Sequence, residues 1–60
     1  MMVEYSLTAE RTSDGGVSYT ANEDLKLNPY IHEELERDAT RLIQRNPKRK
    51  SVEIKVIEDN

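Results

Sequence analysis

Three stretches of the chain place apolar residues at every second position. They span residues 2–10, 17–21 and 51–57. A period of two is the pattern of a strand with one buried face. We therefore predict three strands over these ranges. Their alternating apolar residues are Val3, Tyr5, Leu7, Ala9, Val17, Tyr19, Ala21, Val52, Ile54 and Val56.

The segment between the first two stretches is rich in turn residues and predicts a hairpin. A two-residue loop at Asp14-Gly15 would set Ala9 opposite Thr20, an apolar residue against a polar one. A three-residue loop with Gly15 in the left-handed conformation sets Ala9 opposite Tyr19 instead. That register keeps the apolar side chains on one face, so we predict it. Its pairs are Leu7 with Ala21, Ala9 with Tyr19 and Arg11 with Val17.

The segment 29–45 has the period of a helix. Asn28 offers a capping side chain before it, and Pro47 cannot continue it. We predict a helix over 29–45, with Leu35 and Leu42 at the centre of its buried face. The apolar stripe consists of Ile31, Leu35, Ala39, Leu42 and Ile43.

The order strand, strand, helix, strand predicts the topology of the sheet. A right-handed crossover through the helix lets the third strand lie antiparallel against the first. We predict a two-layer α+β fold, β-β-α-β, with a three-stranded antiparallel sheet in the order 2-1-3 and one long helix packed on one face. Residues 1–60 form a single small domain. Leu25 and Leu27 are expected to pack beneath the helix.

Composition makes a homodimer the expected state. The 60 residues contain no cysteine, phenylalanine or tryptophan, and a single core below about 70 residues rarely supplies more than about 3–5 kcal/mol. The third strand is an apolar sheet edge, while Tyr30 and Ile57 lie off the predicted core. The candidate residues of a dimer or partner interface are Tyr30, Val52, Ile54, Val56 and Ile57.

Charge is distributed unevenly along the chain. The net charge is −3, but residues 1–36 carry −6 and residues 37–60 carry +3. Clustered cations can bind phosphates, whereas cations near a helix C-terminus also favour the helix dipole. Both interpretations remain open. The candidate polyanion-binding residues are Arg41, Arg45, Lys48, Arg49, Lys50 and Lys55.

The sequence contains no recognisable catalytic motif. His32 is the single histidine, and with Glu36 on the same helix face it supplies two metal ligands, which do not close a site. A Ser-His-Asp arrangement would depend on the same histidine. We expect a non-enzymatic protein with no catalytic residue, cofactor or metal. Since no signal peptide or membrane span is recognisable, we expect a cytoplasmic protein without a membrane partner.

Two hypotheses for the function follow. The first is a small interaction or regulatory protein, homodimeric, that binds another macromolecule. The alternative is a nucleic-acid-binding module that uses the basic residues between 41 and 55. The hairpin with its Asp14-Gly15-Gly16 turn, the long helix and the return strand resemble the layout of small antitoxin domains of the HicB type. This resemblance concerns the order of the elements and the turn alone, and it assigns no functional residue.

Overall fold

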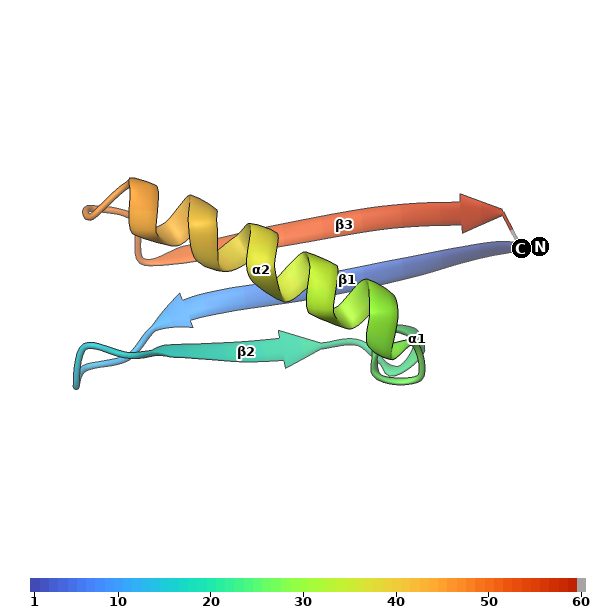
Figure 1. Ribbon diagram of the computed structural model, residues 1–60, viewed down its shortest axis with the longest axis horizontal. Coiled ribbons are helices and arrows are strands. Elements are labelled where there is room, and N and C mark those ends of the chain that lie inside the picture. The colour runs from blue at the N-terminus through green and yellow to red at the C-terminus, as the bar shows by residue number, and fades with distance from the viewer. Residues whose placement is uncertain (60) are drawn as a thin grey trace.

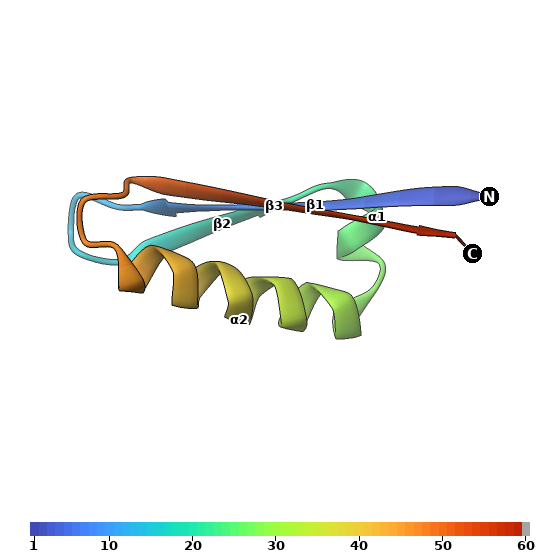
Figure 2. The ribbon, with the colours of Figure 1, turned by 90° about the horizontal axis from the view of Figure 1, so that it is seen from above.

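Strand β1 (Met2–Arg11) lies at the centre of the sheet. In the computed structural model, which describes residues 1–59, β2 (Val17–Ala21) and β3 (Ser51–Asp59) both run antiparallel to β1. Helix α2 (Pro29–Arg45) forms a second layer on one face of the sheet (Figures 1 and 2). The predicted α+β fold, with its sheet order 2-1-3 and one long helix, is confirmed.

The hairpin between β1 and β2 has the predicted register. Arg11 lies opposite Val17, and the N–H of Thr12 donates to the carbonyl oxygen of Gly16 at 3.0 Å. Gly15 has a φ of 90°, a region in which a side chain causes strain. The loop is therefore the three-residue turn that keeps the apolar residues of both strands on one face.

Strand β3 pairs with β1 from Ser51, opposite Glu10, to Asp59, opposite Met2. The sequence predicted an end at Ile57, where the apolar alternation stops. The strand continues through the two acidic residues that follow because β1 offers main-chain partners as far as Met2. Main-chain pairing, and not side-chain burial, decides where this strand ends.

The core lies between the sheet and the helices and is entirely apolar among residues 1–59. Helix α2 crosses the sheet diagonally, with its N-terminal end toward β2 and its C-terminal end over β3 (Figure 1). As a result, the far ends of β1 and β3 extend beyond the helix as a two-stranded ribbon. The buried side chains are those of Tyr5, Leu7, Ala9, Leu25, Leu35, Ala39, Ile43 and Val52.

A short helix, α1 (Glu23–Lys26), occupies the connection that the sequence left irregular. The side chain of Asn22 accepts a hydrogen bond from the N–H of Leu25 at 3.0 Å and so caps this helix. Leu25 is completely buried, as expected, but Leu27 is 82% exposed. The prediction for Leu27 is wrong because it is the C-terminal cap of α1 and points away from the core.

Leu42 does not lie at the centre of the buried face of α2. It is 38% exposed, whereas its neighbour Ile43 is fully buried. The helix is rotated toward β2, where the hydroxyl groups of Thr40 and Tyr19 are hydrogen-bonded. This rotation places Ala39 and Ile43 over the sheet and moves Leu42 to the margin, so the prediction for Leu42 is wrong.

Candidate functional site

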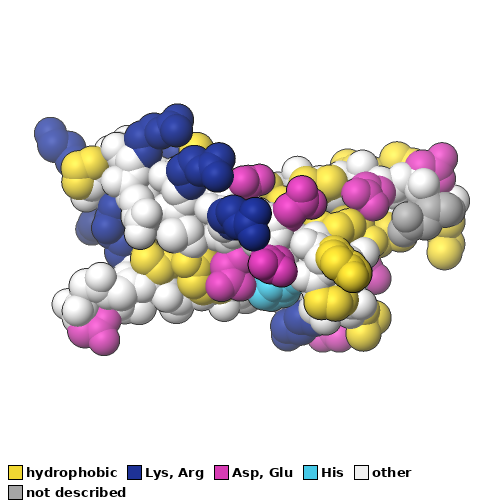
Figure 3. Space-filling model, viewed as in Figure 1, with side chains coloured by type: hydrophobic (Ala, Val, Ile, Leu, Met, Phe, Trp, Pro, Cys, Tyr) yellow, Lys and Arg dark blue, Asp and Glu magenta, His cyan; other side chains and the backbone are white. Residues whose placement is uncertain are grey.

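The basic residues gather at the end of the molecule where α2 stops. Figure 3 shows Lys and Arg side chains concentrated over this end of the helix layer. Lys48, Arg49 and Lys50 form the connection from α2 to β3, and all three are exposed. Together with the β1–β2 turn they line a shallow depression, whose residues are Glu10, Arg11, Thr12, Ser13, Pro47, Lys48, Arg49 and Lys50.

Arg11, which the sequence indicated only as the register partner of Val17, fixes the shape of this end. Its Nε donates to the carbonyl oxygen of Arg49 at 2.8 Å, and its Nη2 donates to those of Asn46 at 3.3 Å and Ile43. A guanidinium is well suited to bond the unpaired carbonyls at the end of a helix. The signal available in the sequence was a cation next to a turn, which does not reveal a contact with residues more than 30 positions away.

The six candidate polyanion-binding residues do not form one continuous surface. Arg41 and Arg45 line a second depression, between α2 and β3, together with Asp38, Leu42 and Ile54. Lys55 lies on the face of the sheet opposite α2, where its Nζ is 4.0 Å from a carboxylate oxygen of Glu53. The structure thus brings Lys48, Arg49 and Lys50 of the connection together and separates them from Lys55.

The five candidate interface residues lie in three different environments. Tyr30 and Ile57 are 85% and 59% exposed. Val52 is buried in the core, so its side chain is not available to a partner. Ile54 and Val56 are half-buried on the helix side of β3.

The outer edge of β3 carries main-chain groups that pair with no strand among residues 1–59, because β3 ends the sheet. The N–H of Arg11 donates to the carbonyl oxygen of Lys50 at 2.8 Å. Main-chain groups alternate in direction along an antiparallel strand, so the even-numbered residues of β3 bond to β1. The N–H and C=O groups that point outward therefore belong to Ser51, Glu53, Lys55, Ile57 and Asp59.

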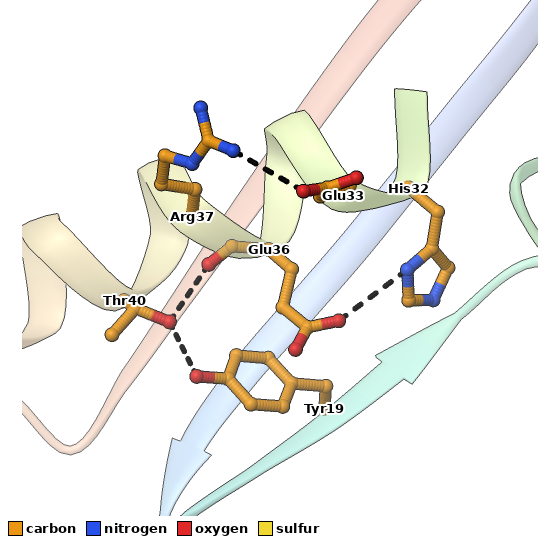
Figure 4. Close-up of polar contacts among 6 residues, drawn as sticks. All are labelled: Tyr19, His32, Glu33, Glu36, Arg37 and Thr40. Carbon is orange, nitrogen blue, oxygen red and sulfur yellow. Dashed lines mark hydrogen bonds and ion pairs between the residues drawn. The ribbon is translucent and has the colours of Figure 1, made fainter. Parts of the chain in front are cut away.

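A string of polar groups links α2 to β2 (Figure 4). The hydroxyl of Thr40 donates to the carbonyl oxygen of Glu36 at 2.7 Å and is bonded to the hydroxyl of Tyr19. The Nδ1 of His32 lies 3.4 Å from a carboxylate oxygen of Glu36. On the outer side of α2, Arg37 pairs with Glu33 at 3.3 Å. Of these contacts, the bond between Thr40 and Tyr19 joins α2 to β2 and fixes the rotation of the helix, while the others lie within α2.

Asp14, in the hairpin turn, has a perturbed carboxyl group. The hydroxyl of Thr12 donates to it, and so does the N–H of Gly16 at 3.2 Å. These bonds, the hydroxyl first, stabilise the charged form and lower the pKa of Asp14 below its ordinary value. The carboxylate is fully exposed and serves to shape the turn.

Comparison with known proteins finds no relative of this chain. No protein-family model, curated protein or solved structure matches the chain.

Within the part of the chain that the structure describes, no three His, Cys, Asp or Glu side chains are grouped to hold a metal ion. In the same residues, neither helix has the length and apolar character needed to cross a bilayer.

Proposed function

We propose that this chain is a small non-enzymatic binding protein that acts as a homodimer and recognises another macromolecule through its surface. The observation that carries the proposal is the exposure of two large apolar side chains at the junction of α1 and α2. Leu27 is 82% exposed and Tyr30, three residues later, is 85% exposed. Neighbouring exposed apolar side chains favour contact with a partner, and aromatic residues are enriched at such contacts.

The absence of a buried reactive group favours binding over catalysis. Among residues 1–59, no polar or charged side chain is buried. Active sites commonly rely on groups that are partly removed from water and so have altered reactivity. The exposed acids and bases of this protein are suited to contacts between macromolecules.

Site-specific photo-crosslinking tests the recognition of a partner. A benzophenone amino acid at position 30 should give covalent adducts with a macromolecule in the native host cells. The matched control places the benzophenone amino acid at position 20, because Thr20 is exposed on the face of the sheet opposite α2. Equal labelling from both positions, or adducts from position 30 with a second copy alone, would count against recognition through this junction.

The homodimer is tested separately. Light scattering across a concentration series should give twice the monomer mass, and the melting temperature should rise with protein concentration. A monomer mass at hundreds of micromolar, with a constant melting temperature, would contradict the dimer. Recognition through Tyr30 does not depend on this outcome.

The alternative function is binding of nucleic acid by the basic end of the molecule. It is favoured by the positions of Arg37, Arg41 and Arg45, which follow one another at intervals of four along α2, and by the exposed connection 48–50. Labelled RNA and DNA should then bind at low salt, with an affinity that falls steeply as salt is raised.

Paired substitutions make this test specific. Arg41→Gln with Arg45→Gln should weaken binding and reduce the salt slope by about 2, since each phosphate contact contributes roughly 1. Lys26→Gln removes an exposed cation from α1, at the end of α2 opposite the basic connection, and serves as the control. Absence of binding at low salt would exclude the nucleic-acid function.

A further inference from the structure

The charges of β3 and of the residues before it are arranged with opposite signs about Ile54. Glu53 precedes this residue and Lys55 follows it. Farther out, Lys50 stands four positions before Ile54 and Glu58 four positions after it. Arg49 lies five positions before Ile54 and Asp59 five positions after it, again with opposite charges. Val52 and Val56, two positions to either side of Ile54, are both apolar. A strand with this arrangement is complementary to its own reversed copy.

From this complementarity we infer that β3 pairs antiparallel with β3 of a second copy, about a two-fold axis that passes beside Ile54. The inference deepens the proposed function, because it names the surface of the homodimer on which that function rests. The two three-stranded sheets then form one continuous six-stranded sheet. Because the axis is perpendicular to the sheet, both α2 helices lie on the same face.

The outward main-chain groups of β3 fit this register. The N–H and C=O of Glu53 face those of Lys55 in the second copy, and Ser51 faces Ile57 in the same way. Such residues form hydrogen-bonded pairs, with Cα atoms about 5.5 Å apart. Ile54 faces its own copy as a non-hydrogen-bonded pair, about 4.5 Å apart. Every outward group from Ser51 to Ile57 thus obtains a partner.

Neighbouring registers place like charges or mismatched residues together. Moving the axis to Lys55 sets Lys55 opposite its own copy, and moving it to Glu53 does the same for that carboxylate. Like charges directly opposite each other are destabilising. Moving the axis to Val56 sets Ile54 opposite Glu58, and moving it to Val52 sets Ile54 opposite Lys50. The axis at Ile54 pairs each charge with one of opposite sign.

The same register covers apolar surface that α2 leaves open. Ile54 and Val56 are half-buried, and Leu42, which lines a depression together with Ile54, is 38% exposed. In the dimer, Val56 of the second copy lies opposite Val52, beside the C-terminal half of α2. The exposed margin of each helix layer therefore faces apolar residues of the other copy.

Cysteine cross-linking tests the register directly, since the chain has no cysteine of its own. Ile54→Cys should oxidise to a disulfide-linked dimer, because two Cα atoms about 4.5 Å apart can be bridged. A mixture of Glu53→Cys and Lys55→Cys should give a mixed dimer. Each of these two variants alone should cross-link poorly, because its Cα atoms then lie more than about 7 Å apart. Thr20→Cys, in β2, is the control for random collision.

Charge reversal provides an independent test in solution. Glu53→Lys or Lys55→Glu should each raise the dimer dissociation constant about tenfold, since two symmetry-related pairs become repulsive. The double variant restores opposite charges and should return the constant close to its original value. Glu34→Lys, on the outer surface of α2, is the matched control.

The outcomes separate the register from the function. Cross-linking at position 54 and rescue by the double variant would support the β3 register. A dimer by light scattering that neither cross-links at these positions nor responds to charge reversal would overturn the register and leave the homodimer standing. A monomer at hundreds of micromolar would overturn both. The photo-crosslinking at Tyr30 tests recognition of a partner independently of either result.

Discussion

The side chain of Arg11 is bonded to the main chain of Arg49: the Nε of Arg11 donates to the carbonyl oxygen at 2.8 Å. This contact joins the end of β1 to the connection between α2 and β3. Because the same guanidinium also bonds the carbonyl of Asn46 at 3.3 Å, one side chain fixes both the end of the helix and the path of the basic connection.

Replacement of Arg11 should loosen this end of the molecule. Arg11→Gln is expected to lower the free energy of unfolding by about 1–2 kcal/mol, since hydrogen bonds from a charged donor are lost. Chemical denaturation measures the loss. Arg37→Gln removes an exposed arginine whose partner is Glu33 and should cost less than about 0.5 kcal/mol. Equal effects of the two substitutions would contradict the anchoring role of Arg11.

Alanine substitutions at the adjacent residues Leu42 and Ile43 should differ sharply in how much they lower the free energy of unfolding. Ile43→Ala removes a fully buried side chain and should cost about 2–5 kcal/mol, enough to abolish cooperative unfolding in so small a domain. Leu42→Ala should cost about 1 kcal/mol, because this residue is already 38% exposed. Thermal unfolding followed by circular dichroism measures the loss of stability in both variants. A larger loss at position 42 would contradict the rotation of α2 toward β2.

The cap of α1 should contribute more than the cap of α2. The side-chain oxygen of Asn22 accepts from Leu25 at 3.0 Å, and its amide donates to the carbonyl of Glu4 at 2.8 Å. Asn22→Ala should therefore cost about 2 kcal/mol, through the lost cap and the lost contact with β1. Asn28 caps α2 through one bond of 3.3 Å, so Asn28→Ala should cost about 1 kcal/mol. A reversed order would show that the contact with β1 is unimportant.

The hairpin turn should be sensitive to acid. The lowered pKa of Asp14 means that its carboxylate form stabilises the folded turn. That stability is present above the ordinary aspartate pKa of about 3.9 and is lost as the pH falls through the lower, folded value. A carboxyl NMR titration should give a midpoint below the ordinary value, and Thr12→Val should raise it. Asp38→Asn, on α2, should leave the Asp14 midpoint unchanged. A midpoint at or above the ordinary value would contradict the turn geometry.

Alternation and turn chemistry predicted most of the architecture. The three strands, the helix over 29–45 and the hairpin register followed from periodicity, because side chains with one buried face repeat with the period of their element. Leu42 was assigned wrongly because its spacing fits the stripe, while the rotation of α2 depends on the contact between Tyr19 and Thr40. A pattern within one element does not contain a contact between two elements.

The candidate site was less predictable for the same reason. Exposure of Tyr30 and Ile57 followed from their positions off the apolar stripes. The contacts of Arg11 with Arg49 and Asn46 depend on how the hairpin meets the end of α2, and the sequence around Arg11 carries no trace of them. Strand alternation already places Lys55 on the face of the sheet opposite the helix. The grouping of Lys48, Arg49 and Lys50 with the β1–β2 turn depends on the folded chain.

The position of β1 also determines the order in which the sheet can be completed. Its pairing with β2 closes a short loop, whereas its pairing with β3, which sets Met2 opposite Asp59, requires contacts between residues at the two ends of the chain. Loop closure costs more entropy as the loop lengthens, and such distant contacts slow folding. During synthesis β1 emerges before β2, and both emerge before β3. One side of the central strand therefore has no strand partner until residues 51–59 have been synthesised.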